Sequence, residues 1–171
     1  EVLDRSLGSF EDHIYWKRLF APAGAVAPYP AGSNMTISIN LPQLLVNSAT
    51  PVRVKVYARG RDVNSADPIH HLGFFINSAS TMAASHEFQT QKPTIFDVLI
   101  PANFFSAGNN NIKLQVLADK VDAGDFDLID IDKVVVEYQA AKVAINNQAL
   151  ILNPQSDPAA GVSGFSSAHT A

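Results

Sequence analysis

The 171-residue chain contains no cysteine. This absence excludes thiol nucleophiles, disulfides, iron–sulfur clusters and zinc sites built on thiolates. It also removes the usual sequence indication of a redox compartment. Long apolar runs are missing too, since runs such as 134–136 and 149–152 fall far short of the roughly 18 residues that a membrane-spanning helix requires. We therefore expect no membrane span.

Positive charge is scarce and scattered. Twelve Lys and Arg stand against sixteen Asp and Glu, for a net charge of -4. An acidic chain without a basic cluster has no electrostatic means of binding nucleic acid, so we expect no nucleic-acid partner. The composition is 47% hydrophobic and 16% charged, which is apolar enough to bury the core of one domain.

No stretch shows a sustained helical period, and the dominant period is two. Residues 51–58 alternate valine with Arg53, Lys55 and Tyr57, which is typical of a strand with one buried face. Further strands are predicted over 13–20, 35–41, 70–77, 85–90, 94–100, 112–116, 128–138 and 142–152. Single helical turns are predicted at 41–45 and 101–105, where Pro42 and Pro101 are tolerated.

Many short strands without βαβ alternation predict an all-β fold. The specific expectation is an antiparallel β-sandwich of jelly-roll, galactose-binding-like topology. Composition changes after Tyr138, and residues 153–171 are rich in Pro, Ala, Ser and Gly. We expect a β-sandwich domain over 1–141 and a strand extension and linker over 142–171, leading toward a missing downstream domain.

Nucleophile signatures are absent as well. No serine lies in a G-x-S-x-G elbow, although five histidines leave room for a triad that local sequence does not show. His70 and His71 are the most conspicuous polar pair. Neighbours on a strand point to opposite faces, so these two rings are not expected to share one metal ion. A structural, hydrogen-bonding role is the favoured interpretation, and we expect no catalysis in this chain.

Acidic residues gather late in the chain, at Asp119, Asp122, Asp125, Asp127, Asp130, Asp132 and Glu137. Calcium takes several oxygen ligands from carboxylates and loop carbonyls, which such a run can supply. The spacing does not match an EF-hand loop, since Gly124 is not followed by the expected Glu. The alternative is a solvated loop and the polar face of a strand, where charge discourages edge association.

Aromatic side chains are candidates for a sugar-binding face. Exposed rings would mark one, and the candidates are Tyr15, Trp16, Tyr29, Tyr57 and Tyr138. Ten Phe and one Trp are explained more simply as core, and the alternation around Trp16 does not decide which face it occupies. Both interpretations stay open at the level of sequence.

Several blocks occur in an order that resembles a known protein region. They are the His-His strand at 70–77, the Ile-Pro and Gly-Asn turn at 100–110, and the closing strand at 127–138. Together with an opening strand at 11–16 and a link at 143–165, they resemble the β-sandwich preceding the catalytic domain of bacterial gingipain-like cysteine peptidases. Those enzymes use a Cys and a His in a separate α/β domain, and this chain has neither Cys nor a βαβ pattern.

The resemblance implies a non-catalytic accessory or pro-region of a secreted bacterial multidomain protein. Its partner would be the downstream domain of the same polypeptide, and its location extracytoplasmic or at the cell surface. An apolar, protein-facing patch would then be exposed near 142–152, and contacts of this kind bury roughly 600–1,500 Å².

Such sandwiches also resemble galactose-binding-type carbohydrate modules. In some of these, an early acidic residue and a late Asp bind a structural calcium. The counterparts here would be Glu11 or Asp12 with Asp130 or Asp132. This resemblance implies the alternative function, a calcium-assisted carbohydrate-binding module with a glycan or protein ligand.

Overall fold

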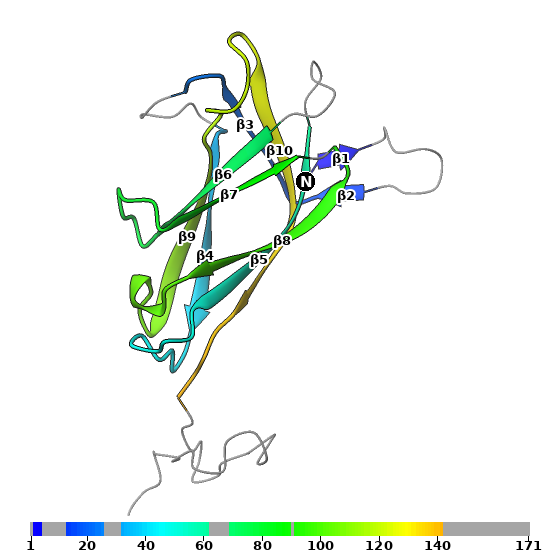
Figure 1. Cartoon of the computed structure of the whole chain (residues 1–171). Coiled ribbons are helices and arrows are strands. Elements are labelled where there is room, and N and C mark those ends of the chain that lie inside the picture. Colours follow the sequence, from blue (N-terminus) through cyan, green and yellow to red (C-terminus); the bar gives the residue numbers. More distant parts are fainter. Residues whose placement is uncertain (1, 5–12, 26–31, 62–68, 90, 142–171) are drawn as a thin grey trace, which may run out of the picture.

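The computed structural model describes residues 2–4, 13–25, 32–61, 69–89 and 91–141 (Figure 1). Two four-stranded sheets face each other. The first has the order β3 (Lys17–Pro22), β10 (Phe126–Glu137), β5 (Val52–Gly60) and β8 (Pro93–Ile100). The second has the order β4 (Asn34–Leu41), β9 (Gly108–Val116), β6 (Ile69–Ile76) and β7 (Ala84–Gln89). Among the described residues, no helix has the length and hydrophobicity needed to cross a membrane.

Two smaller elements complete the described fold. Strands β1 (Val2–Asp4) and β2 (His13–Tyr15) pair with each other in a separate two-stranded sheet, and β2 lies next to β10. A single 3-10 turn, η1 (Ala102–Phe104), follows β8. Of the two expected helical turns, the one at 101–105 is confirmed in this form. The other forms a turn at Pro42–Gln43 that leads into an isolated bridge at Leu44.

The strand order establishes a jelly roll. The hairpin β6–β7 is the innermost pair, and β5–β8, β4–β9 and β3–β10 follow outward along the chain as three further antiparallel pairs. Successive pairs alternate between the two sheets, so the chain wraps around its own core. This nested pairing is the two-Greek-key arrangement of a jelly roll and confirms the predicted antiparallel sandwich.

The core lies between the sheets and follows from the period of two. On β5, Val52, Val54 and Val56 are buried, while Arg53 points outward. The same alternation supplies the other large buried side chains, which are Leu19, Leu72, Phe74, Ile76, Ile100, Ile112, Leu114, Ile129 and Ile131. Burial of each such side chain contributes about 1.5–3 kcal/mol, so this interior accounts for most of the driving force for folding. The strand predicted over 142–152 and the extension 142–171 lie outside the described residues.

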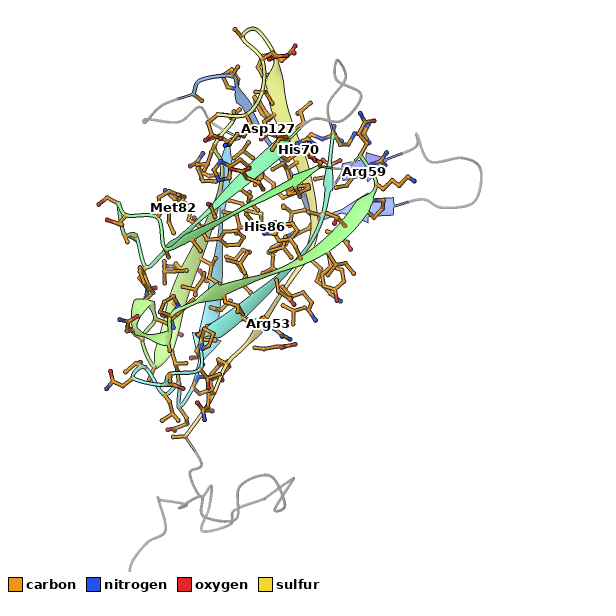
Figure 2. All side chains as sticks on the ribbon, in the orientation of Figure 1. Arg53, Arg59, His70, Met82, His86 and Asp127 are labelled. Carbon is orange, nitrogen blue, oxygen red and sulfur yellow. The ribbon has the colours of Figure 1, made fainter. Side chains whose placement is uncertain are left out.

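The gap between edge strands β7 and β8 is closed by stacked rings. His86 stacks on Phe96 with ring centres 4.1 Å apart and an interplanar angle of 11°. Phe88 joins them, 5.2 Å from Phe96 and 5.1 Å from His70. His86 is labelled in Figure 2, and it lies on edge strand β7, facing Phe96 of edge strand β8. Burial lowers the pKa of His86 from its ordinary value, because a charged ring is poorly solvated there.

This lowered pKa predicts a pH dependence of stability. Because the unfolded chain binds the His86 proton more readily than the folded chain, the free energy of unfolding is highest above the ordinary pKa of about 6.5 and falls as the pH drops below it. The variant His86→Phe keeps the ring stack but has no proton to bind. Between about pH 7.5 and 5.5, its free energy of unfolding, measured with urea, should therefore fall less than that of the wild type. Equal losses in the two proteins would contradict this role of His86.

Candidate functional site

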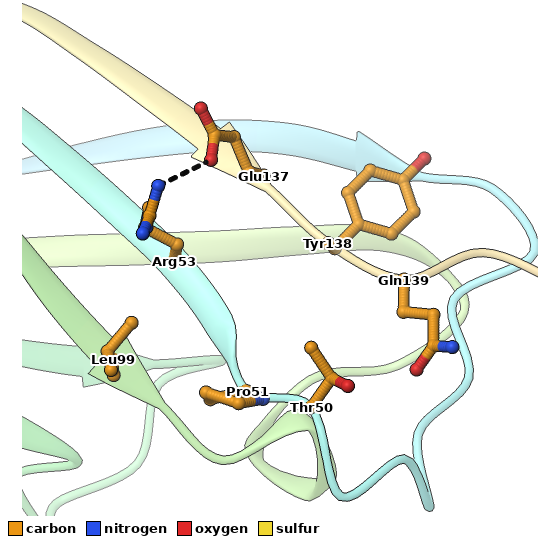
Figure 3. Close-up of a pocket in the computed structure, with 7 residues that line it drawn as sticks. All are labelled: Thr50, Pro51, Arg53, Leu99, Glu137, Tyr138 and Gln139. Carbon is orange, nitrogen blue, oxygen red and sulfur yellow. Dashed lines mark hydrogen bonds and ion pairs between the residues drawn. The ribbon is translucent and has the colours of Figure 1, made fainter. Parts of the chain in front are cut away.

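A pocket of about 590 Å³ opens at the end of the sandwich where β5 begins and where β8 and β10 end (Figure 3). Its volume lies within the range of small-ligand sites, about 300–1,000 Å³. It is lined by Thr50, Pro51, Arg53, Leu99, Glu137, Tyr138 and Gln139. Three strand ends and the loop before β5 therefore contribute to a single concave surface.

Strand register brings the central side chains together. Arg53 pairs with Leu99 on one side and with Glu137 on the other, so the three residues form a row on the outward face of the first sheet. The Arg53 Nη1 lies 3.2 Å from Glu137 Oε2, and its Nε lies 3.7 Å from Asp97 Oδ2. The two carboxylates hold the guanidinium plane in place and leave the row without a net positive charge.

The pocket wall at Tyr138 is fixed by the loop between β4 and β5. The Tyr138 hydroxyl donates to the Pro42 carbonyl oxygen at 3.2 Å. The Leu45 N–H donates to the Gln139 carbonyl oxygen at 3.0 Å, and the Ser48 hydroxyl donates to Gln139 Oε1. Backbone pairing of the chain after β10 with this loop therefore sets the positions of the Tyr138 ring and the Gln139 amide before any ligand arrives.

The chemistry of the lining is suited to binding. The described lining combines Tyr138, the Arg53–Glu137 ion pair, the Gln139 amide and the Thr50 hydroxyl with the apolar Leu99 and Pro51. Glu137, the carboxylate among the described lining residues, is paired with Arg53. The groups present are hydrogen-bond partners for a polar ligand.

The two adjacent histidines lie at the opposite end of the sandwich and each binds a carboxylate. His70 is fully buried, with its Nδ1 2.7 Å from Asp127 Oδ1, and Figure 2 shows the two side chains together. His71 occupies the other face of β6, with its Nδ1 2.7 Å from Asp119 Oδ1. The predicted opposite orientation is confirmed. The His70 Nε2 is buried and has no hydrogen-bond partner in the part of the chain that the structure describes.

Of the four predicted calcium ligands, the structure describes Asp130 and Asp132. Both oxygens of Asp130 accept hydrogen bonds from Arg18, from Nε at 2.7 Å and from Nη2 at 2.9 Å, and Arg61 Nε lies 4.0 Å away. Asp132 is exposed at a β-bulge of β10. Glu11 and Asp12 lie outside the described residues. Among the residues with described side chains, no group of three or more His, Asp or Glu is arranged to hold a metal ion, so the calcium site stays a prediction.

Asp130 corrects one detail of the sequence interpretation. Alternation placed Asp130 on the solvated outward face, opposite to Ile129 and Ile131, which are buried in the core as expected. Asp130 does occupy the outward face, but its exposed fraction is 0%. The reason is local, because the Arg18 guanidinium from β3 and the neighbouring Arg61 cover the carboxylate and neutralise it.

The aromatic candidates differ in their surroundings. Trp16 is 48% exposed, and Tyr57 lies beneath the Lys133 ammonium, 4.5 Å from the ring centre. Tyr138 is the aromatic that lines the pocket. The side chain of Tyr15 and residue Tyr29 are outside the described part of the chain.

Sequence reasoning identified Tyr138 as a candidate but missed its pocket partners. Arg53 and Glu137 lie 84 positions apart in the chain, and neither has a local motif around it. The sequence did indicate one of these partners, because the alternation in 51–58 places Arg53 on the outward face of its strand. The residue opposite Arg53 depends on strand pairing, which periodicity does not specify.

No protein-family model matches the chain, and no curated protein matches it. Among solved structures, the chain is similar to a carbohydrate-binding module of type CBM36 in complex with calcium and xylotriose. The identity is 15% over 67% of this chain and 78% of that chain, with a TM-score of 0.40. It is also similar to the CBM36-1 domain of a multidomain xylanase from the hindgut metagenome of Trinervitermes trinervoides. There the identity is 10% over 58% of this chain and 70% of that chain, with a TM-score of 0.37.

A third similar structure is TmCBM61 in complex with β-1,4-galactotriose, with 16% identity over 62% of each chain and a TM-score of 0.37. The strand order, and not these similarities, establishes the jelly roll of this chain. None of the three structures is a gingipain-like peptidase, so the resemblance to that family's sandwich region gains no support from them.

Burial of the Arg18–Asp130 pair predicts that Arg18 contributes much more to the free energy of unfolding than Arg53, which lies on the same face of the sheet. Arg18→Met leaves a fully buried carboxylate with a weakened partner set and should lower the free energy of unfolding by about 2–3 kcal/mol. Arg53→Met removes a pair whose carboxylate is 51% exposed and should cost less than about 1 kcal/mol. Urea unfolding of both variants measures the difference, and similar losses would show that Asp130 is not held in this way.

Proposed function

We propose that this domain is a non-catalytic saccharide-binding module and that the pocket around Tyr138 is its binding site. The observation that carries the proposal is the lining itself. Tyr138, which packs partly buried against the core and is held by its hydroxyl at Pro42, lines the pocket together with the Arg53–Glu137 pair, the Gln139 amide and the Thr50 hydroxyl, within a volume of about 590 Å³.

The physical argument rests on the two-sided chemistry of a sugar ring. One face of a pyranose exposes C–H groups, which pack well on the face of an aromatic side chain such as Tyr138. The edges carry neighbouring hydroxyls that donate and accept. Planar groups with paired donors or acceptors, here Arg53, Glu137 and the Gln139 amide, are able to bind such hydroxyls in a bidentate manner.

The charge of the pocket favours a neutral ligand. The Arg53 guanidinium is already flanked by Glu137 and Asp97, so an anionic ligand would meet two carboxylates for one cation. Leu99, 57% exposed, and Pro51 add an apolar margin that suits the C–H groups of a neutral sugar.

The accessory-domain hypothesis requires a different surface. Its expected apolar patch at 142–152 lies outside the described residues, so the pocket is the better supported site. A saccharide-binding module of this kind would meet polysaccharides outside the cell, which agrees with the extracytoplasmic location that the sequence resemblance implied.

Removing the ring should abolish most of the binding. In calorimetric titrations with xylotriose, cellotriose and β-1,4-galactotriose, Tyr138→Ala should weaken binding of the recognised sugar at least about tenfold, or ~1.4 kcal/mol. Tyr138→Phe keeps the stacking face and should stay within about threefold of the wild type. Tyr57→Ala removes a matched tyrosine outside the pocket and should leave affinity unchanged. Binding by Tyr138→Ala equal to the wild type would refute the pocket assignment.

Binding at this pocket should not depend on calcium. Among the lining residues that the structure describes, Glu137 is the one carboxylate, and it is already engaged by Arg53, whereas calcium takes six to eight oxygen ligands. We expect equal affinities in excess calcium and in EDTA. A loss of affinity in EDTA would place a calcium ion in the binding mechanism. A rise of several degrees in Tm with calcium alone would support a structural site elsewhere in the chain.

A further inference from the structure

A second hollow lies on the outward face of the other sheet. It has a volume of about 400 Å³ and runs between β4 and β9, near the end of the sandwich that also carries the Tyr138 pocket. We call it the amide groove, and its lining residues are Ser38, Ile39, Asn40, Asn109, Asn110 and Asn111. Among the described lining residues none is charged and none is aromatic, so the chemistry of the groove differs from that of the pocket.

Antiparallel register places four polar side chains as two facing pairs. Ser38 lies opposite Asn111, and Asn40 lies opposite Asn109. All four residues are exposed and point away from the core, because the inward positions of these strands carry the buried chains. Facing Cβ atoms in such pairs are about 4.5–5.5 Å apart, and successive pairs on one face follow at about 6.8 Å. The four side chains therefore form one compact polar quartet.

The end of the groove next to the β8–β9 loop is rigid. Asn110 is 2% exposed, and its amide oxygen accepts from Asn77 Nδ2 and from the Ser106 N–H at 2.9 and 2.8 Å. Its Nδ2 donates to the carbonyl oxygens of Ser106 and Gly108 at 2.7 and 2.9 Å. All four of these hydrogen bonds are to other groups of the protein. This end of the groove therefore keeps its shape without a ligand, and binding does not have to pay for ordering it.

A second contact ties the groove to the turn after β6. The Asn77 side-chain oxygen accepts from the Asn111 N–H at 2.9 Å, and Asn77 itself adopts a left-handed backbone with φ 52°. Such a conformation costs free energy in a residue other than glycine and persists where neighbouring contacts impose it. Here the contacts to Asn110 and Asn111 provide that support.

The exposed amides of the groove are available to a ligand. Ser38 donates to Asn111 Oδ1 at 2.8 Å, whereas the amides of Asn40 and Asn109 have no hydrogen-bond partner among the residues that the structure describes. Each amide presents two donors and an acceptor side by side. Without a cation the groove does not attract phosphates or carboxylates, and without an apolar floor it does not favour a hydrophobic ligand. Neutral, closely spaced hydroxyls match it best.

We propose that the amide groove is a second saccharide-binding site of this domain, which recognises a neutral sugar through hydrogen bonds alone. The proposal rests on the saccharide-binding function proposed above. The two sites lie on the outward faces of the two opposing sheets and are linked along the chain, because Pro42, whose carbonyl oxygen accepts from the Tyr138 hydroxyl, follows Asn40 by two residues. A longer polysaccharide that meets both sites would gain affinity by linkage, because the second binding event becomes intramolecular.

The test is a two-dimensional NMR titration of the full chain with xylotriose, cellotriose and β-1,4-galactotriose. Side-chain amide signals report each site separately, with Asn40 and Asn109 in the groove and Gln139 in the pocket. With a recognised sugar, the groove and pocket signals should both shift and should fit different Kd values. The double variant Asn40→Ala/Asn109→Ala should weaken groove binding at least fivefold, read from Asn111, and leave the Kd at Gln139 unchanged.

Thr36→Ala is the matched control. Thr36 is exposed on the same face of β4 but outside the groove, and its substitution should change neither Kd. The wild-type titration does not depend on any variant folding, so it decides the question by itself. Shifts at Gln139 with none at Asn40 and Asn109 would overturn the second site and leave the proposed function intact.

Two further outcomes distinguish the second site from the proposed function of the pocket. Shifts in the groove without shifts at Gln139 would support the second site and refute the pocket assignment. No shift at either site, with these sugars and with a broad glycan array, would overturn both the proposed function and the second site.

Discussion

Strand β10 pairs with both β3 and β5, and one of its faces packs against the core while the other faces outward. A single β-bulge allows its apolar side chains to point into the core along the whole strand. It pairs with β3 over residues 126–131 and with β5 over 129–137, with a register shift between Ile131 and Lys133. Before the bulge, Ile129 and Ile131 point into the core. After it, Val134 and Val136 pack against the core, and Glu137 points outward.

Strict alternation beyond Ile131 would reverse this arrangement. Because side chains change face at every residue, a strand without the bulge would turn Glu137 toward the core and Val134 toward solvent. The bulge therefore sets the Glu137–Arg53 pair on the outward face and brings Tyr138 to the loop at Pro42. The geometry of the pocket depends on one extra residue in its central strand, several positions away.

Carboxylates near the start of β10 stabilise the other end of the sandwich. Asp127 bridges the two sheets by binding His70 and the His71 N–H, at 2.7 and 3.2 Å, and Asp130 joins β10 to Arg18 of β3. Each buried carboxylate meets a partner that offsets its desolvation, as burial of charge requires. One end of the fold is thus held by internal polar pairs, whereas the end with the pocket and the amide groove presents its polar groups outward. Together these outward groups form the surface on which the saccharide-binding proposals rest.

The sequence by itself determined the fold class and most strand positions, because a period of two with β-branched residues separates core from solvent locally. It also determined that His70 and His71 face opposite sides. Only the tertiary structure decided that Asp130 is buried beneath Arg18, that β10 contains a bulge, and that Arg53 meets Glu137. These features depend on which strands become neighbours and in what register. Pairing between residues 84 positions apart in the pocket and 73 apart in the amide groove leaves no periodic trace in the chain, so both hollows appear only once the sheets have assembled.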